Sequence, residues 1–184
     1  MSLRFREAKT TQAAARLLTL RGGRMNYMKL LKLLYIVERE ALLTWGRPVT
    51  ADRCVSLPKG PILSQTLNLI NEGPAPDTPS TWAEHISQPE NYDVRLLSPV
   101  GDDELSEAEK ALIDDVFRRY GAMKRWVLVD LVHTFPEWQD PDGSALPITY
   151  RDILKAGGKS ELEIAAILQD IDAVAQADAL LPAL

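Results

Sequence analysis

The chain of 184 residues contains one cysteine, Cys54, and two histidines, His85 and His133. With a single cysteine, no disulfide can form within the chain, which is typical of proteins from a reducing compartment. A structural or catalytic zinc site needs three or four converging ligands, and neither histidine has another ligand residue at a recognisable spacing. We therefore expect no metal, no cofactor and a cytoplasmic location.

Long apolar runs are also absent. The N-terminus, Met-Ser-Leu-Arg-Phe-Arg-Glu, lacks the apolar core of a secretory signal. The most apolar stretch is residues 27–45, and charges at membrane depth would be costly there. The charged residues that interrupt it are Lys29, Lys32, Glu38, Arg39 and Glu40. We therefore expect no membrane span and no membrane partner.

Acidic and basic residues are distributed unevenly along the chain. Residues 1–32 carry eight Lys and Arg but only one acid, Glu7, for a net charge of +7, whereas the remaining residues carry −12. A basic segment of this kind could attract nucleic-acid phosphates through Arg16, Arg21 and Arg24. The acidic remainder supports a stronger alternative, in which the segment lies against the protein's own surface. We therefore do not expect nucleic acid as a partner.

Helical patterns predict the architecture. Apolar residues at helical spacing predict a first helix over residues 7–21. Residues 27–45 have no wide polar face and predict a helix buried at the centre of the domain, with Asn26 as its N-cap and Gly46 as its stop. We expect a mainly α (α+β) fold: one domain over 1–184, a compact helical bundle around this central helix. Its parts would be a basic N-terminal helix region over 1–25, a core over 26–175 and a short tail over 176–184.

Capping residues and prolines predict the remaining helices. Capping boxes begin two of them, Ser106-x-x-Glu109 and Ser160-x-x-Glu163. Thr149 is expected to cap a short helix that runs to residue 155, and Pro61 is expected at the first position of a helix that runs to Gly73. A further helix is predicted over 124–134, with these side chains expected in the core: Trp126, Val127, Leu128, Leu131 and Val132.

Short strands complete the predicted fold. Residues 53–57 have strand-like content, and residues 92–96 alternate apolar with charged side chains. A third short strand is expected at 82–86. We expect the first two segments to form a small antiparallel element of two or three strands.

Groups that could support catalysis are sparse. Cys54 and His133 could form a nucleophile and base only if the fold brings them together. The acids at 102–109 precede or begin a predicted helix, where backbone dipoles stabilise negative charge. Residues 57–61 precede another predicted helix but lack the Gly-Lys-Ser/Thr ending of a nucleotide-binding loop. We expect no catalytic residue, and a small-molecule enzyme remains an alternative of a different class.

Several segments together resemble one known family. The opening signature of the SocA-like Panacea antitoxin domain is similar to Lys29-Leu30-Leu31-Lys32-Leu33-Leu34-Tyr35, Gly46-Arg47-Pro48-Val49, Asp52 and Pro58-Lys59-Gly60-Pro61-Ile62. Later in the chain, three features resemble the second half of that family's domain: His133 with Trp138, then Pro147-Ile148, then a short helix containing Ile153. The resemblance covers residues 5–171.

The resemblance implies a mainly helical antitoxin of phage-associated or toxin–antitoxin systems, which neutralises a separately encoded toxin by direct stoichiometric binding. One branch of the family is an adaptor that presents a toxin to an ATP-dependent protease, so such a protease is a second candidate partner. Cys54 and Lys59 depart from the residue types expected at their positions, which affects the identity of the toxin more than the fold. A homodimer remains open.

The resemblance divides the motif residues into structural and partner-binding groups. Those carried over as structural are Lys29, Leu30, Lys32, Leu33, Leu34, Tyr35, Gly46, Pro48, Pro58, Gly60, Pro61, His133 and Trp138. Aromatic residues and arginine dominate interface hot spots, and the chain's turns should display exposed side chains in a constant geometry. The exposed candidates for toxin contact are Trp45, Arg47, Asp52, Lys59 and Trp82.

Overall fold

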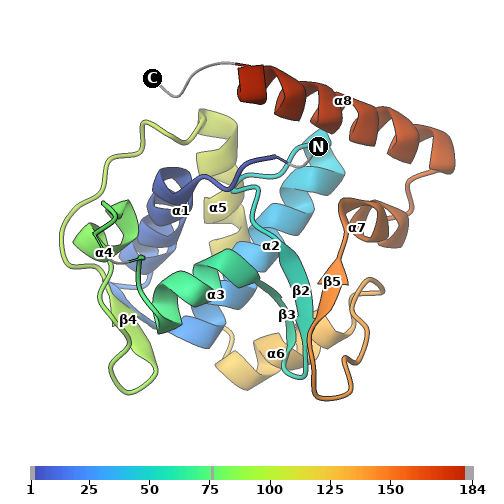
Figure 1. Cartoon of the computed structure of the whole chain (residues 1–184). Helices are drawn as coiled ribbons and strands as arrows, with labels where there is room; N and C mark the ends of the chain where they lie inside the picture. Colours follow the sequence, from blue (N-terminus) through green and yellow to red (C-terminus); the bar gives the residue numbers. More distant parts are fainter. Residues whose placement is uncertain (1–2, 76, 181–184) are drawn as a thin grey trace.

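The structure, a computed structural model, describes residues 3–75 and 77–180. It is a single mostly helical α+β domain with two small antiparallel sheets (Figure 1), which confirms the predicted fold class. The helices are α1 (Glu7–Leu20), α2 (Tyr27–Trp45), α3 (Ser64–Asn71), α4 (Thr81–His85), α5 (Glu107–Tyr120), α6 (Arg125–His133), α7 (Tyr150–Ala156) and α8 (Glu161–Leu180). The strands are β1 (Arg24–Asn26), β2 (Cys54–Leu57), β3 (Gly60–Leu63), β4 (Asp93–Arg95) and β5 (Leu146–Ile148).

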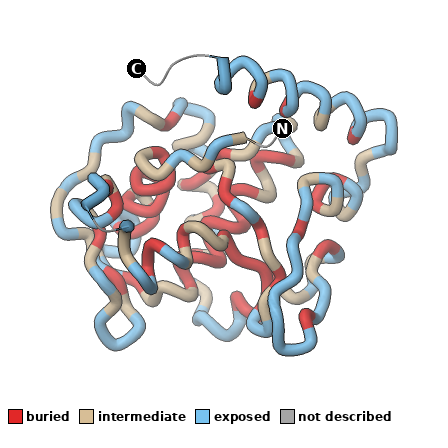
Figure 2. The backbone as a smooth tube through the Cα atoms, viewed as in Figure 1, coloured by how far each residue is buried: buried red, intermediate tan, exposed pale blue. Residues whose placement is uncertain are grey.

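Helix α2 forms the centre of the domain, as its apolar composition predicts. Most of its 19 residues are buried, on all sides of the helix. It contacts α1, α5, α6, α7 and β3, and Figure 2 shows the buried residues gathered along it. The helix ends at Gly46, whose φ of +68° is the left-handed conformation that stops helices. Burial of this single helix therefore organises the whole fold.

The start of α2 differs from the prediction in one respect. Asn26 occupies the N-cap position, but its side chain makes no capping hydrogen bond. Its Nδ2 instead donates to the carbonyl oxygen of Tyr92 at 3.0 Å. Asn26 ends β1, and the pairing of β1 with β4 holds Tyr92 against the start of the helix. This tertiary contact replaces the local cap.

The two predicted strands exist but do not pair with each other, so the expected single sheet is wrong. Strand β4 pairs with β1, in the register Met25 to Val94. Strand β2 pairs with β3 on one side and with β5 on the other. Because β3 follows β2 after only Pro58 and Lys59, and β5 occupies the remaining edge, β2 has no side left for β4.

Two other local predictions are also wrong. Pro61 lies in β3 and not at the start of a helix; α3 begins at Ser64. Pro61 is tolerated because β3 is an edge strand, where a missing N–H leaves no ladder bond unmade. The expected strand at 82–86 is mostly the helix α4, capped by Ser80 Oγ, which accepts from the N–H of Ala83. Burial of Trp82 explains the apolar pattern there without a strand.

The later helices follow their predicted signals, with one error in burial. Ser106 and Glu109 form the predicted capping box, and so do Ser160 and Glu163. Trp126 and Val127, expected in the core, are 49% and 51% exposed, because the core side of α6 is formed by later residues such as Val132.

Helix α8 continues through the start of the expected tail, since residues 176–180 are helical. The last part of that tail, 181–184, and the first two residues of the expected basic region lie outside the described residues. None of the helices within the described ranges has both the length and the apolarity needed to cross a membrane.

Candidate functional site

Polar side chains recur every three residues along α2, and each is bonded to a different segment of the chain. The Lys29 amine donates to the carbonyl oxygens of Gly121 and Met123, at 2.6 and 2.7 Å. The Lys32 amine donates to the carbonyl oxygen of Pro61 at 2.8 Å. A three-residue spacing places both lysines on one side of the helix. Helix α2 thereby fixes the loop between α5 and α6 and the hairpin formed by β2 and β3.

The next turn of α2 fixes two further segments. The Tyr35 hydroxyl and the Arg39 guanidinium both donate to Glu137, at 2.9 and 2.6 Å. Glu38 accepts from the N–H of Val49 at 2.8 Å, and from both the N–H and the hydroxyl of Thr50 at 2.9 Å. Buried polar groups that are satisfied in this way favour one arrangement of the chain.

Burial sets the protonation of these groups. Desolvation lowers the pKa of Lys32 to about 7. It raises the pKa of Glu38 to about 7, although the hydrogen bonds from Thr50 and Val49 act in the opposite direction. Desolvation also holds the pKa of Tyr35 far above its usual value, so this hydroxyl is a hydrogen-bond donor. Each of these three side chains bonds to another segment of the chain, so a structural role accounts for its burial.

Asp52 and Trp82 were expected at the surface, and this expectation is wrong. Asp52 is 1% exposed and Trp82 is 0% exposed. The Asp52 carboxylate accepts from the backbone N–H groups of Arg53, Gln65 and Thr66 and from the Thr66 hydroxyl, at 2.6 to 2.9 Å. It therefore satisfies the first N–H groups of α3 from twelve residues earlier in the chain. A cap at this sequence distance has no local signature.

Trp45, Arg47 and Lys59 are exposed, as expected, but they do not form one patch. Lys59 lies at the hairpin turn, and the amine of Lys32 is bonded to Pro61 in the same hairpin. Trp45 is thirteen residues further along α2, which is about 20 Å at a rise of about 1.5 Å per residue. The expected contact residues thus lie at two separate parts of the domain.

A second group of exposed residues surrounds Lys59. Lys59 Nζ lies 5.8 Å and Arg125 Cζ lies 5.2 Å from the ring centroid of Trp126. Helix α6 and β3 are in contact, so the hairpin turn and the first turn of α6 are adjacent. We call this surface the hairpin–α6 face; its residues are Pro58, Lys59, Lys124, Arg125, Trp126 and Val127.

The hairpin under this face is held from one side by α6 and the segment after it. Trp138 Nε1 donates to the carbonyl oxygen of Leu57 at 3.1 Å. His133 Nε2 lies 3.2 Å from the carbonyl oxygen of Pro58, and its ring packs edge-on against Trp138 at 4.3 Å. Gly60 has a φ of +89°, and a Cβ there would lie 2.8 Å from a methyl group of Val132. The turn therefore requires glycine and is closely packed on α6.

The hairpin–α6 face has an excess of positive charge in an acidic protein. Within residues 3–75 and 77–180, Lys59, Lys124 and Arg125 have no acidic partner, and neither does nearby Arg21. Most other cations of the N-terminal region are paired: Arg6 with Glu104, Lys9 with Glu109, Arg16 with Asp114 and Arg24 with Asp93. These pairs confirm that much of the basic segment lies against the protein's own acidic surface.

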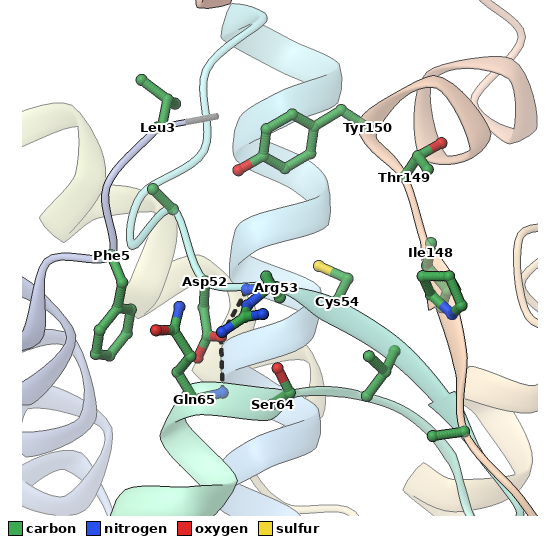
Figure 3. Close-up of a pocket in the computed structure, with 14 residues that line it drawn as sticks. Leu3, Phe5, Asp52, Arg53, Cys54, Ser64, Gln65, Ile148, Thr149 and Tyr150 are labelled. Atoms are coloured by element: carbon green, nitrogen blue, oxygen red, sulfur yellow. Dashed lines mark hydrogen bonds between the residues drawn. The ribbon is translucent and has the colours of Figure 1, made fainter. Parts of the chain in front are cut away.

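A separate cavity of about 690 Å³ opens between the N-terminal segment, β2, α3 and the junction of β5 with α7. Figure 3 shows Phe5 on one side of it and Ile148 on the other, with Tyr150 and Ser64 at opposite ends. Cys54 also lines it. Desolvation and nearby carboxylates hold the pKa values of Cys54 and Tyr150 well above their usual ranges, so both groups are protonated.

The structure does not bring Cys54 and His133 together as a catalytic pair. Cys54 begins β2, between Leu63 and Ile148 on the neighbouring strands. His133 contacts Pro58, just beyond the other end of β2. The two ends of this four-residue strand are about 10 Å apart at about 3.3 Å per residue. No cluster of three or more potential metal ligands occurs among the residues that the structure describes.

Comparison with protein families gives one match. The family described as antitoxin SocA-like, Panacea domain, matches residues 30–139 of the chain. The matched region covers more than half of the sequence. The chain belongs to this antitoxin family. No curated protein and no solved structure matches it.

The match to the Panacea domain runs from α2 to the residue after Trp138. It therefore contains Lys32 and Glu38 with their loop partners, and the whole hairpin–α6 face. Strand β5 and helices α7 and α8 follow the matched region, so the cavity is lined from both parts of the chain.

In this Panacea domain, Arg125 and Trp126 are exposed but are not among the contact residues predicted from the sequence. The sequence predicts Trp126 in the core because the residues that follow it, Val127 and Leu128, are apolar. A signal for exposure was present in Lys124-Arg125-Trp126, since lysine and arginine are rarely buried without a partner. The adjacency of this turn to Lys59 could not be read from positions more than 60 residues apart.

Proposed function

We propose that this Panacea-domain protein is an antitoxin that neutralises a cognate toxin by direct stoichiometric binding, and that the toxin contacts the hairpin–α6 face. The observation that carries the location is Trp126, 49% exposed and flanked by the cationic groups of Lys59 and Arg125. Tryptophan and arginine are the residue types most enriched among interface hot spots.

The charge of the face supports an acidic surface on the toxin. The protein has a net charge of −5, yet its hairpin–α6 face carries three cations that have no acidic partner among the residues the structure describes. Complementary charge accelerates encounter and favours the correct partner. The chain therefore presents a local surface that an acidic toxin can approach in spite of the protein's overall negative charge.

The rigidity of the hairpin supports the same location. Three side chains bond to backbone carbonyl oxygens of the hairpin: Lys32 to that of Pro61, His133 to that of Pro58 and Trp138 to that of Leu57. A surface that is already ordered loses less conformational entropy when it binds. Lys59 and Trp126 are thus held close to each other before the toxin arrives.

The test is a growth assay in a bacterial host, in which reading frames adjacent to this one in the source genome are expressed with and without this protein. We expect one of them to be toxic, to be rescued by the protein and to copurify with it. The double variant Lys59→Ala/Trp126→Ala should lose rescue and bind the toxin at least about 30-fold more weakly, since the truncation of even one hot-spot residue costs about 2 kcal/mol or more.

The matched control is Arg47→Ala/Trp45→Ala, which also removes one exposed cation and one exposed tryptophan, here 41% exposed, at the other end of α2. Its binding should remain within about threefold of the wild type. These two residues were also predicted as toxin contacts, so the comparison tests both surfaces. Loss of rescue only in the control variant would overturn the assignment of the face, and rescue without a complex would overturn direct binding. Circular dichroism should show that both variants are folded.

The half-life of the toxin in the rescued cells tests the mechanism further. Occlusion predicts that the toxin persists while growth recovers. A shortened half-life that depends on an ATP-dependent protease would instead establish the adaptor mechanism found in one branch of the family.

A further inference from the structure

The cavity beside Tyr150 has apolar walls on two sides. Phe5 and Leu3 of the N-terminal segment form one wall, and Val55 and Ile148 of the neighbouring strands β2 and β5 contribute to the other. Its volume of about 690 Å³ lies in the range of small-molecule sites, which are mostly apolar with a few polar groups that orient the ligand. The walls alone would accept any apolar body of this size.

Four polar side chains without partners converge on the same cavity. Within the described ranges, Arg53, Ser64, Gln65 and Tyr150 line the cavity, and none of their side chains has a hydrogen-bond or ion-pair partner. Figure 3 shows Arg53, Ser64 and Gln65 grouped at one end and the Tyr150 ring at the other. Arg53 is exposed and Ser64, Gln65 and Tyr150 are partly buried, so all four side chains are accessible to a ligand that enters the cavity.

These free groups are mainly donors. Arg53 offers a guanidinium, which can only donate, and Tyr150 offers a hydroxyl whose pKa is raised by burial. The carboxylate of Asp52 also lines the cavity, but it is already saturated by three backbone N–H groups and one hydroxyl. Thr149 is occupied as well, because its hydroxyl donates to Asp152. What remains for a ligand is one cation and several neutral donors.

We propose that this cavity is a binding site for an apolar group that carries a carboxylate. The carboxylate lies between the Arg53 guanidinium and the side chains of Ser64 and Gln65, and the apolar body extends between Phe5 and Ile148 toward Tyr150. Arginine binds carboxylates in a bidentate geometry, which gives the site direction as well as charge. The site is distinct from the hairpin–α6 face, and its existence does not depend on the proposed function.

The first test uses the isolated protein and 4-phenylbutyrate as the probe, followed by ¹H–¹⁵N NMR. We expect saturable shifts of the backbone amides of Cys54, Ser64, Gln65 and Ile148 as the probe reaches about 10 mM. The uncharged analogue 4-phenylbutyramide should bind about three- to tenfold more weakly, because it lacks the charge that a partly exposed arginine attracts.

Two variants decide whether the proposed groups are responsible. Arg53→Gln should abolish the preference for the carboxylate over the amide. Arg47→Gln is the matched control, since Arg47 is also exposed and without a partner in the described chain but lies outside the cavity. It should leave the preference unchanged. Tyr150→Phe keeps the ring and removes one donor, and it should weaken both ligands.

The proposal is overturned if the shifts fall outside the cavity, if no saturable shift occurs, or if the amide binds as well as the carboxylate. It is also overturned if Arg53→Gln and Arg47→Gln behave alike.

A second measurement identifies the source of the carboxylate once a toxin is known. Displacement of the probe by the toxin, together with weaker toxin binding by Arg53→Gln, would show that the toxin supplies an acidic side chain next to an apolar one. A toxin complex that still binds the probe would exclude the toxin as the source of the carboxylate and assign the cavity to a free small molecule. If no toxin is found, the proposed function fails while the NMR titration still decides the fate of the cavity.

Discussion

Replacing Lys32 by methionine tests how the centre of this fold is held together. Lys32 is 1% exposed, and its amine donates to the carbonyl oxygen of Pro61. Burial lowers its pKa from 10.5 in the ordinary state to about 7. Methionine has a similar length and no charge, so the variant Lys32→Met removes both the cost of burying an ammonium group and this hydrogen bond.

The pH dependence separates these two effects. Between pH 7 and 10.5 the unfolded chain binds more protons at Lys32 than the folded protein, so the free energy of unfolding rises with pH in this window. With a folded pKa of about 7, the rise from pH 7 to pH 9 amounts to about 2 kcal/mol, at about 1.4 kcal/mol per pKa unit. The lost hydrogen bond to Pro61 costs about 1–3 kcal/mol at every pH.

We therefore expect the wild type to gain about 2 kcal/mol relative to Lys32→Met on going from pH 7 to pH 9. The measurement is urea denaturation followed by circular dichroism at both pH values. Glu38 does not disturb this comparison, since its pKa of about 7 places its main effect below pH 7 and it is present in both proteins.

Lys155→Met is the control, because Lys155 is exposed on α7. Its difference from the wild type should be nearly the same at both pH values. If the difference for Lys32→Met is also constant within about 0.5 kcal/mol, Lys32 is not held in a low-dielectric environment and our account of the α2 contacts is wrong.

Three further variants test other parts of the same structure by urea denaturation. Between pH 5 and pH 7 the wild type should lose about 2 kcal/mol relative to Glu38→Gln, because a raised pKa stabilises the folded state only while the group is protonated; a constant difference would contradict this. Asp52→Asn should lower the free energy of unfolding by about 2–3 kcal/mol, since an amide nitrogen cannot accept hydrogen bonds from the N–H groups at the start of α3. Asp140 is exposed, so the control Asp140→Asn should change the free energy of unfolding little. Gly60→Ala should lower the free energy of unfolding by about 1–3 kcal/mol and weaken toxin binding, because the added Cβ meets Val132. Gly143 also has a positive φ, of +80°, but a Cβ there would meet open space, so Gly143→Ala should lower the free energy of unfolding less and leave toxin binding unchanged. Equal costs for the two glycines would refute the close packing of the hairpin on α6.

Local patterns in the sequence were sufficient for the helices. Burial of α2 follows from the absence of a polar face, and the capping boxes at Ser106 and Ser160 mark helix starts because both partners lie within four residues. The family could also be recognised, because its motif residues keep their order and spacing along the chain.

Predictions failed where a residue's environment comes from a distant segment. The position of Pro61 suggested a helix, but pairing of Gly60–Leu63 with β2 made it a strand. Trp126 is exposed because the first turn of α6 lies beyond the core, and Asp52 is buried because α3 begins beside it. Neither the apolar nature of tryptophan nor the charge of aspartate indicates which neighbours the fold will supply.

The class of the domain, its central helix and its family follow from periodicity, caps and ordered motifs within short stretches of chain, and these can be read from the amino-acid sequence. Which side chains are available for binding depends on tertiary packing. The hairpin–α6 face joins Lys59 to Trp126 across 67 positions, and the cavity joins Phe5 to Arg53 and Tyr150. Such surfaces depend on how separate segments pack, and packing is a property of the whole folded chain.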